Sequence, residues 1–547
     1  MRSLSILAAV VLATGAWPDP EKGLAEAGSS AEGAHDERSL GTVEFPISCA
    51  PEAQEEFERG VALLHHMMYV EAGKTFRSLA EAHPECAMAR WGVAMTLFQP
   101  LWPTRPSPEA LAEGWEAVQA ARALAPGDER EQAFIAAVEA FFQDPESGDY
   151  WARIRRFEEA SERVYRAYPE DREAAAFYAL AHLATAGQAE EPSVHNAEAA
   201  EILLAIYDEE PTHPGAVHYT IHANDIDSRA GESLEVVRSY DDIAPGVPHA
   251  LHMPTHIFVR LGEWDEVIRW NEKSADAALK FPAGDRVSHH YPHALDYLLY
   301  AHLQRAEDER AREILAAAQS KDGYQPSFIS AFHLAAMPAR YAVERRQWAD
   351  AAALAERSPE SIPWDEFPWP VAMNQFARGL GAARGGDPEG AREAIEKLAR
   401  QEAQAQEAGE EYFATQIEIS RLAVEAWAAH AGGESAKALE LMRASAELEA
   451  STQKHPVTPG AILPSYELLG DLHAELGQPG EALAAYEASL QAWPGRFNSL
   501  LGAARAAAAA GDDTRARSYY SSLLELASEP GSARPELEEA RAFVGAA

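Results

Sequence analysis

Apolar and polar residues follow a helical pattern along nearly the whole chain. No stretch alternates apolar and polar residues as a half-exposed strand does, and alanine dominates throughout. In SYELLGDLHAELGQPGEALAAYEASLQAWP (465–494), the small Ala482 stands where two helices would touch, and Tyr486 stands one helical turn further on. Both residues recur 34 positions later, as Ala516 and Tyr520. This period predicts stacked helical hairpins and an all-α fold.

With Gly470 and Pro494, this spacing resembles that of the tetratricopeptide repeat (TPR) family. The same arrangement recurs twice upstream, in residues 67–85 and 379–398, at Ala72, Phe76, Pro84, Gly379, Ala391 and Ile395. The resemblance covers most of residues 45–530 and implies a TPR-type superhelix (α-solenoid) of about ten helical hairpins. It also implies a concave surface that can hold a peptide or protein partner, and it implies no reaction.

Two histidine pairs keep the same 34-residue period. His218 and His222 lie in HPGAVHYTIH, and His252 and His256 lie at the matching positions of HALHMPTHIF. Each pair is spaced i,i+4, so its imidazoles share one face of a helix. Because neighbouring helices pack about 8–10 Å apart, the four side chains can meet at one point. Pro254 bears on this register, since a helix that begins there would leave His252 on a loop.

The next two repeats extend this polar stripe, and the second of them, HLAAMPARYAVERRQW (333–348), matches from His333 and ends the stripe in the cation Arg340. In HALDYLLYAH, the residues His293, Asp296 and Tyr300 stand at the positions of His249, His252 and His256. Clusters of imidazoles suit transition metals, so we predict a site for copper or zinc, with iron as a further candidate. The predicted ligands are His218, His222, His252, His256 and Asp296, the last as a ligand or as the acceptor that orients an imidazole. Asp225, His249 and His293 are predicted to lie behind or beside these ligands. The predicted catalytic residues are Tyr300 and Arg340.

Several functions fit a histidine-lined groove. A bound metal, mononuclear or dinuclear, would make the protein an oxidoreductase or a hydrolase acting on a small molecule or peptide, or the metal would be the cargo of a carrier. Without metal, the protein would be a scaffold whose histidines bind a peptide or protein partner or sense pH near ~6.5. Isolated histidines are interpreted as packing residues: His182, His333, His430 and His473. The roles of His65 and His66 stay open.

Charge and the N-terminal segment bear on partners and location. Lys and Arg number 46 against 87 Asp and Glu, a net charge of −41, and such a surface repels nucleic acid and anionic membranes. Residues 1–16 have the basic, apolar and small-residue segments of a signal peptide, and no later apolar run is long enough to span a membrane. We therefore predict an exported protein, periplasmic or extracellular. Residues 17–43 would be a flexible acidic leader, 44–374 the histidine-lined array, and 375–547 a C-terminal array open to a protein partner.

The chain has two cysteines, Cys49 and Cys86, about one repeat apart. In an oxidising compartment they can form a disulfide, which would add roughly 3–4 kcal/mol of stability; two separately buried thiols are the alternative. The blocks HPGAVHYTIH and HALHMPTHIFVRLGEW, with PECAMARWGVAM upstream, resemble a group of exported bacterial TPR-like proteins. This resemblance implies that the histidine segment is one unit, and it assigns no catalytic residue.

Overall fold

Helices account for most of the chain that the structure describes. The computed structural model describes residues 39–102, 105–124, 127–144, 149–226, 229–527 and 534–545; the predicted signal peptide and most of the leader lie outside these ranges. Within them there is no β-strand, only isolated bridges at Ala283–Arg286 and Val287–Tyr324. No described helix is long and apolar enough to cross a membrane. The predicted all-α fold is confirmed.

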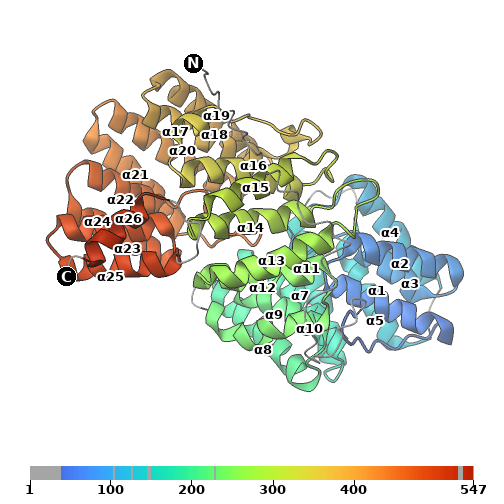
Figure 1. Cartoon of the computed structure of the whole chain (residues 1–547). Helices are drawn as coiled ribbons and strands as arrows, with labels where there is room; N and C mark the ends of the chain where they lie inside the picture. Colours follow the sequence, from blue (N-terminus) through green and yellow to red (C-terminus); the bar gives the residue numbers. More distant parts are fainter. Residues whose placement is uncertain are drawn as a thin grey trace, which may run out of the picture. The chain divides into compact units, whose positions relative to one another are not determined.

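Figure 1 labels the helices in chain order. The first stretch contains α1 (Gln54–His65), α2 (Tyr69–Ala82), α3 (Ala87–Met95), α4 (Pro108–Ala123), α5 (Glu129–Phe142), α6 (Tyr150–Ala167), α7 (Arg172–Thr185) and α8 (Pro192–Glu209). The middle contains α9 (Pro214–Asn224), α10 (Leu234–Ile243), α11 (Pro248–His252), α12 (Pro254–Leu261), α13 (Trp264–Ala278), α14 (His290–Gln304), α15 (Asp308–Gln319), α16 (Phe328–Glu344) and α17 (Trp348–Ala352). The last stretch contains α18 (Pro368–Gly385), α19 (Pro388–Glu407), α20 (Glu411–Ala431), α21 (Ser435–Ala450), α22 (Ser465–Glu475), α23 (Pro479–Ala492), α24 (Phe497–Ala509), α25 (Asp513–Leu526) and α26 (Glu536–Gly545). Short 3₁₀ turns lie at Pro51–Ala53, Ala186–Gln188, Ala230–Ser233 and Trp364–Glu366.

Aromatic residues that fit against glycines hold successive hairpins together. Tyr486 of α23 lies against Gly470 of α22 and Gly502 of α24, where an added Cβ would come within 2.7 Å and 2.3 Å of its ring. Phe76 of α2 packs in the same way between a glycine of α1 and a glycine of α3. Any larger residue at these glycines would push the helices apart. The regular spacing of small and aromatic residues in the sequence therefore marks the positions where one hairpin contacts the next.

The first described residues are tied to the helical array. Ser39 donates its hydroxyl to the carbonyl of Ile243 (2.9 Å), and the backbone N–H of Thr42 donates to the carbonyl of Thr212 (2.9 Å). The leader was expected to extend to residue 43, but these contacts place residues 39–43 with the array. Hydrogen bonds to backbone partners far away in sequence fix this segment across α9 and α10.

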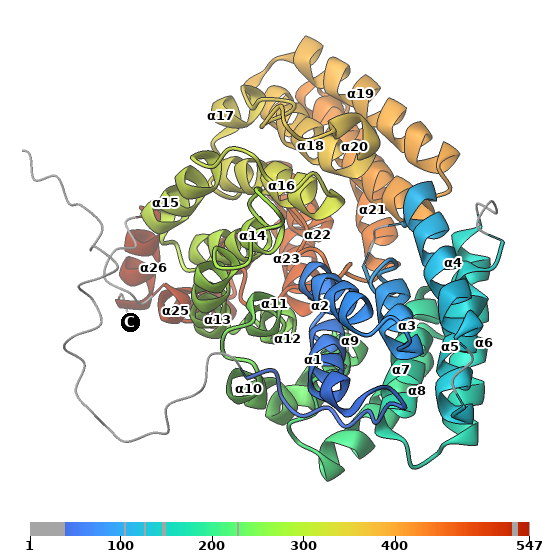
Figure 2. The ribbon, with the colours of Figure 1, turned by 90° about the vertical axis from the view of Figure 1, so that its right-hand side faces the viewer.

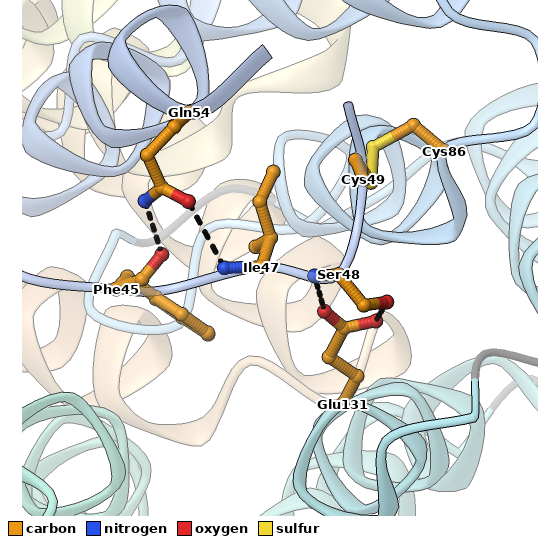
Figure 3. Close-up of a disulfide and its surroundings, with 7 residues drawn as sticks. All are labelled: Phe45, Ile47, Ser48, Cys49, Gln54, Cys86 and Glu131. Carbon is orange, nitrogen blue, oxygen red and sulfur yellow. Dashed lines mark hydrogen bonds between the residues drawn. A yellow bond between two sulfur atoms is a disulfide. The ribbon is translucent and has the colours of Figure 1, made fainter. Parts of the chain in front are cut away.

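The same segment leads into a disulfide between Cys49 and Cys86, which have an S–S distance of 2.04 Å (Figure 3). Just before it, Ser48 donates both its backbone N–H and its hydroxyl to the carboxylate of Glu131 in α5. The side chain of Gln54 in α1 bonds the backbone of residues 45 and 47. The bridge thus joins the chain in front of α1 to the start of α3.

The C-terminal repeats pack against the helices that carry the histidines. Trp264, at the start of α13, donates its indole N–H to the carbonyl of Gly495 (2.8 Å), and Tyr297 of α14 donates its hydroxyl to the carbonyl of Pro456 (3.1 Å). α14 also contacts α24, and the C-terminal helices lie beside α14 in both views (Figures 1 and 2). The expected division after residue 374 falls inside α18. The loop between α21 and α22, residues 451–464, is therefore in position to contribute to the histidine site.

Candidate metal centre

Three histidines from α9 and α11 form the first histidine group: His218, His222 and His249. One ring nitrogen of each lies within 4.8 Å of one ring nitrogen of the other two. Proline begins both helices, at positions where a missing N–H costs no hydrogen bond. The i,i+4 spacing in α9 then aims two imidazoles at the start of α11, with ring centroids 5.0 Å apart.

The second histidine group consists of His252, His256 and His293, from the end of α11, from α12 and from α14. The helix predicted through 252–256 is divided at Met253, because Pro254 has no N–H to continue the hydrogen-bond ladder. Met253 nevertheless keeps helical dihedral angles (φ −53°, ψ −41°). The two histidines therefore stay on one side, and their Nε2 atoms lie 3.1 Å apart.

The two groups are neighbours. The rings of His222 and His256 are 6.0 Å apart, and those of His249 and His252 are 6.1 Å apart. Histidines of both groups line one small cavity, whose remaining walls are His455 and the apolar residues Leu101, Trp102, Ile329, Pro456 and Val457. Each histidine group thus has enough nitrogen donors for one metal ion, and the two groups lie side by side at a shared, largely apolar cavity.

Hydrogen bonds fix the tautomers of the imidazoles. Nδ1 of His218 donates to the carbonyl of His65 (2.5 Å), and Nδ1 of His256 donates to the carboxylate of Asp225 (3.0 Å). Nδ1 of His252 donates to the amide oxygen of Asn271 (2.7 Å), whose NH₂ is occupied by a backbone carbonyl. In each neutral ring the proton is on Nδ1 and the lone pair is on Nε2, as in histidines that bind metals through Nε2.

This tautomer assignment leaves lone pairs without donors. The Nε2 atoms of His252 and His256 face each other as two acceptors at 3.1 Å. In the first group, buried ring nitrogens of all three histidines have no hydrogen-bond partner: Nε2 of His218, Nε2 of His222, and both nitrogens of His249. Buried polar atoms without partners are rare in folded proteins because each costs about 1–3 kcal/mol. A cation among these lone pairs would satisfy them.

The site keeps its imidazoles neutral. Burial, reinforced by the neighbouring histidines, lowers the pKa of His218, His249, His252 and His293 well below the usual value. Burial lowers the pKa of His222 to about 3. Because the neutral imidazole is the form that coordinates a metal, all six side chains are in their ligand form near pH 7.

The two predicted carboxylates lie behind the imidazoles. Asp225 bonds His256, the guanidinium of Arg260 (2.5 Å) and the ammonium of Lys454 (3.1 Å), and these cations hold the pKa of Asp225 far below its usual range despite burial. Asp296 is placed as an orienting acceptor: it bonds Nδ1 of His333 at 3.0 Å. Of the two roles predicted for Asp296, these contacts correspond to the second.

Three residues of the site are absent from the predicted ligand set, although one of them, His333, holds the repeat position of His249 and His293. His333, interpreted as packing, accepts the Nδ1 proton of His293 at 2.5 Å and so leaves the Nε2 lone pair of His293 free to bind. Trp102 lies over the histidines, 5.2 Å from the ring of His249. His455 reaches the cavity from the loop between α21 and α22. Trp102 and His455 lie far from the histidine repeats in sequence, so no spacing argument could find them.

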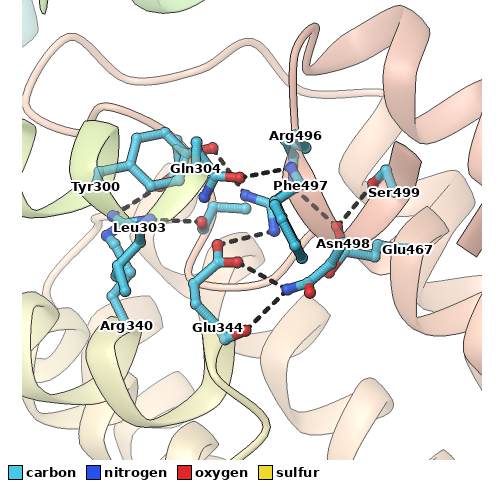
Figure 4. Close-up of polar contacts among 12 residues, drawn as sticks. Tyr300, Leu303, Gln304, Arg340, Glu344, Glu467, Arg496, Phe497, Asn498 and Ser499 are labelled. Atoms are coloured by element: carbon cyan, nitrogen blue, oxygen red, sulfur yellow. Dashed lines mark hydrogen bonds and ion pairs between the residues drawn. The ribbon is translucent and has the colours of Figure 1, made fainter. Parts of the chain in front are cut away.

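Tyr300 and Arg340 lie among polar contacts that join α14 and α16 to the C-terminal repeats (Figure 4). Arg340 donates to the carbonyls of Gly460 (3.1 Å) and Ala461 (2.8 Å), and Tyr300 accepts a hydrogen bond from Arg496 (2.8 Å). Neither residue lines the cavity between the histidine groups. The contacts of Arg340 anchor the loop between α21 and α22, whereas Tyr300 contacts the residue directly before α24. The predicted catalytic role of both residues stays a prediction.

Two other clusters have ligand-type side chains, but their atoms are already engaged. His65 bonds the hydroxyl of Tyr219 (3.0 Å) and the carboxylate of Glu173 (2.8 Å), which His213 also bonds. This buried network lies directly behind the carbonyl that orients His218 and thus supports the first histidine group. The second cluster, Glu158, His182 and His195, is half-exposed and internally hydrogen-bonded.

Comparisons with known proteins assign no function to this chain. No protein-family model matches the sequence, and no curated protein matches it. Among solved structures, a chain of the APC/C hetero-tetramer Cut9–Hcn1 matches at 13% identity, over 89% of this chain and 90% of that chain, with a TM-score of 0.32. Human IFIT1, in a dimer with PPP-AAAA, matches at 13% identity over 88% of this chain and 96% of that chain, with a TM-score of 0.37. Both superpositions are loose, so neither match bears on the histidine site.

Proposed function

We propose that this protein is a copper protein that holds two ions, one in each histidine group, and uses them in redox chemistry. The observation that carries the proposal is the set of inward-facing lone pairs, above all the two Nε2 acceptors of His252 and His256 at 3.1 Å. A proton between them would make a buried imidazolium, which the low pKa of His252 disfavours. A metal ion satisfies both lone pairs and keeps both rings neutral.

The donor set favours copper. Nitrogen ligands alone suit copper and zinc, and copper has the higher affinity of the two for a given site. The charge of the ions also distinguishes copper from zinc. Two divalent ions would bring four positive charges into a site whose nearest carboxylate, Asp225, is already paired with Arg260 and Lys454. Two Cu(I) ions bring half that charge, so their burial costs less.

The surroundings favour an oxidoreductase over a hydrolase. Three imidazoles leave an ion an open position for a reactant, and copper in such sites reacts with dioxygen. The cavity is lined by apolar side chains such as Trp102, Ile329 and Val457, which keep water away from a reactive centre. No carboxylate is among the described residues that line it, so the general base expected of a metal-dependent hydrolase has no candidate there.

Burial and location complete the proposal. The six histidines are largely covered by protein, which suits a small reactant better than an extended peptide and suits a retained ion better than one handed to a partner. The disulfide between Cys49 and Cys86 is the kind of bond that persists in exported proteins, in agreement with the predicted signal peptide. A protein partner on the C-terminal repeats is compatible with this function and is not needed for it.

The test is an anaerobic titration of the metal-free, untagged protein with Cu(I), alongside variants that remove one group at a time. Wild-type protein should bind two equivalents. His218→Gln/His222→Gln and His252→Gln/His256→Gln should each bind one, and His430→Gln/His473→Gln, two histidines remote from the site, should still bind two. A folded wild type that binds no Cu(I) would refute the copper proposal, and if it also binds no zinc in a parallel titration, the metal-free scaffold remains.

A further inference from the structure

A second hollow lies next to the metal cavity, and five aromatic side chains are among the residues that line it. We call it the aromatic chamber. It lies among α16, α18, α20 and the loop between α21 and α22, and its aromatic walls are Phe332, Trp369, Phe376, Tyr412 and Trp493. The metal site uses none of these residues. Flat aromatic walls of this kind bind planar apolar molecules and organic cations.

His455 is the wall that the chamber and the metal cavity share. Its ring lies 5.4 Å from that of Tyr412 and 6.1 Å from that of Trp369, on the chamber side. Its Nδ1 accepts the backbone N–H of Val457 (3.1 Å), so the neutral ring carries its proton on Nε2 and can donate a hydrogen bond. A molecule in the chamber is therefore one imidazole away from the histidines of the metal groups.

The chamber also has a carboxylate, that of Glu449 in α21, whose hydrogen bonds come from neutral donors. It accepts the backbone N–H of Ser465 (2.8 Å). The cation on the same wall, Lys454, is engaged with Asp225 and with the carbonyl of Thr458. Burial raises the pKa of Glu449, and the hydrogen bonds from Ser465 and Trp493 and the charge of Arg496 offset this rise only in part. A cationic group bound beside it would supply a counter-charge.

We propose that the aromatic chamber binds a small aromatic amine and presents it to the metal centre across His455. The ring stacks on the aromatic walls, and the protonated amine forms a charge-assisted hydrogen bond with Glu449. The net charge of −41 also concentrates cations and repels anions at the surface. This inference rests on the proposed copper function for the use of the ligand, but the binding itself can be measured without copper.

Three probes that share a phenol ring test the chamber: tyramine is cationic, p-cresol is neutral, and 4-hydroxyphenylacetate is anionic. Calorimetry on metal-free and copper-loaded protein should give the order tyramine, p-cresol, 4-hydroxyphenylacetate, with tyramine at least roughly 10-fold tighter than p-cresol, as expected for one charge-assisted hydrogen bond. Equal binding of the three probes, or binding of none, overturns the inference whatever the copper content.

Variants assign the preference to the chamber. Glu449→Gln should bring tyramine to the affinity of p-cresol, and Tyr412→Leu should weaken all three probes. The matched control is Glu447→Gln, an exposed residue of the same helix, which should change nothing. A folded Glu449→Gln that keeps the preference overturns the inference, and if this variant does not fold, the wild-type probe series decides. If the protein binds copper but does not prefer tyramine, only the inference that the chamber binds an aromatic amine is refuted. If it prefers tyramine but binds no copper, only the proposed metal function is refuted.

Discussion

Replacing Asp225 with asparagine tests how the carboxylate behind the second histidine group supports the site. Asp225 is fully buried between His256, Arg260 and Lys454, and the last of these comes from the loop that closes the cavity. An amide of the same size keeps the packing but leaves two buried cations without their counter-charge. Breaking a buried ion pair in this way costs about 3–5 kcal/mol. Because the amide would also no longer fix the tautomer of His256, copper affinity should fall roughly 10- to 100-fold.

The readout is hydrogen–deuterium exchange of the loop between α21 and α22, resolved by peptide. Since 1.4 kcal/mol is a factor of ten, the amides of Val457 and Thr458 should exchange roughly 100-fold faster or more. The control is Asp241→Asn, which removes a surface ion pair with the half-exposed Lys273 and should cost no more than about 1 kcal/mol. Unchanged loop exchange together with unchanged copper affinity in Asp225→Asn would refute the role given to this carboxylate.

Other predictions concern the framework. Gly502→Ala should lower stability by about 1–3 kcal/mol in thermal unfolding because its methyl group would overlap an aromatic ring, whereas Gly480→Ala, with open space around it, should not. Loss of the bridge in Cys49→Ser/Cys86→Ser should cost about 4 kcal/mol, from a loop that spans a sequence separation of 37 residues, and a melting temperature equal to that of the wild type would count against it. Burial lowers the pKa of His66 to about 3, against about 6.5 in the unfolded chain, so the unfolded state binds a proton that the folded state does not. Below pH ~6.5 the free energy of unfolding of the metal-free protein should therefore fall by about 1.4 kcal/mol per pH unit because of this residue. In His66→Gln, the fall between pH 7 and pH 5 should be smaller.

The fold and the heart of the site could be predicted because both follow the repeat. A 34-residue period fixes which helix faces meet, so it predicted that His218 and His222 lie near His252 and His256. The four imidazoles do not meet at one point, as the spacing suggested: they belong to two groups, which His249 and His293 complete. The break at Pro254 moved the helix boundary, yet it did not move the side chains, because Met253 kept helical angles. Helix positions and the face of a helix on which a side chain lies can therefore be predicted from the sequence.

The rest of the site depends on contacts between parts of the chain that are remote in sequence. His455 and Lys454 reach the histidines only because the C-terminal repeats pack back against α13 and α14. The same packing engages Arg340 with loop carbonyls, whereas its place at the end of the polar stripe had suggested catalysis. Trp102 lies within a proline-rich segment, QPLWPTRP, that has no repeat partner. A repeat period in the sequence predicts contacts between adjacent repeats. It does not predict which distant repeat packs over the histidines.

The most direct test of the central claim is anomalous diffraction at the copper edge from crystals of the copper-loaded protein. The account predicts two peaks, one among the imidazole nitrogens of the first histidine group and one among those of the second. It also predicts loss of the second peak alone in His252→Gln/His256→Gln. A single peak at the half-exposed cluster around His182, or no peak at either group in protein that has taken up copper, would contradict it.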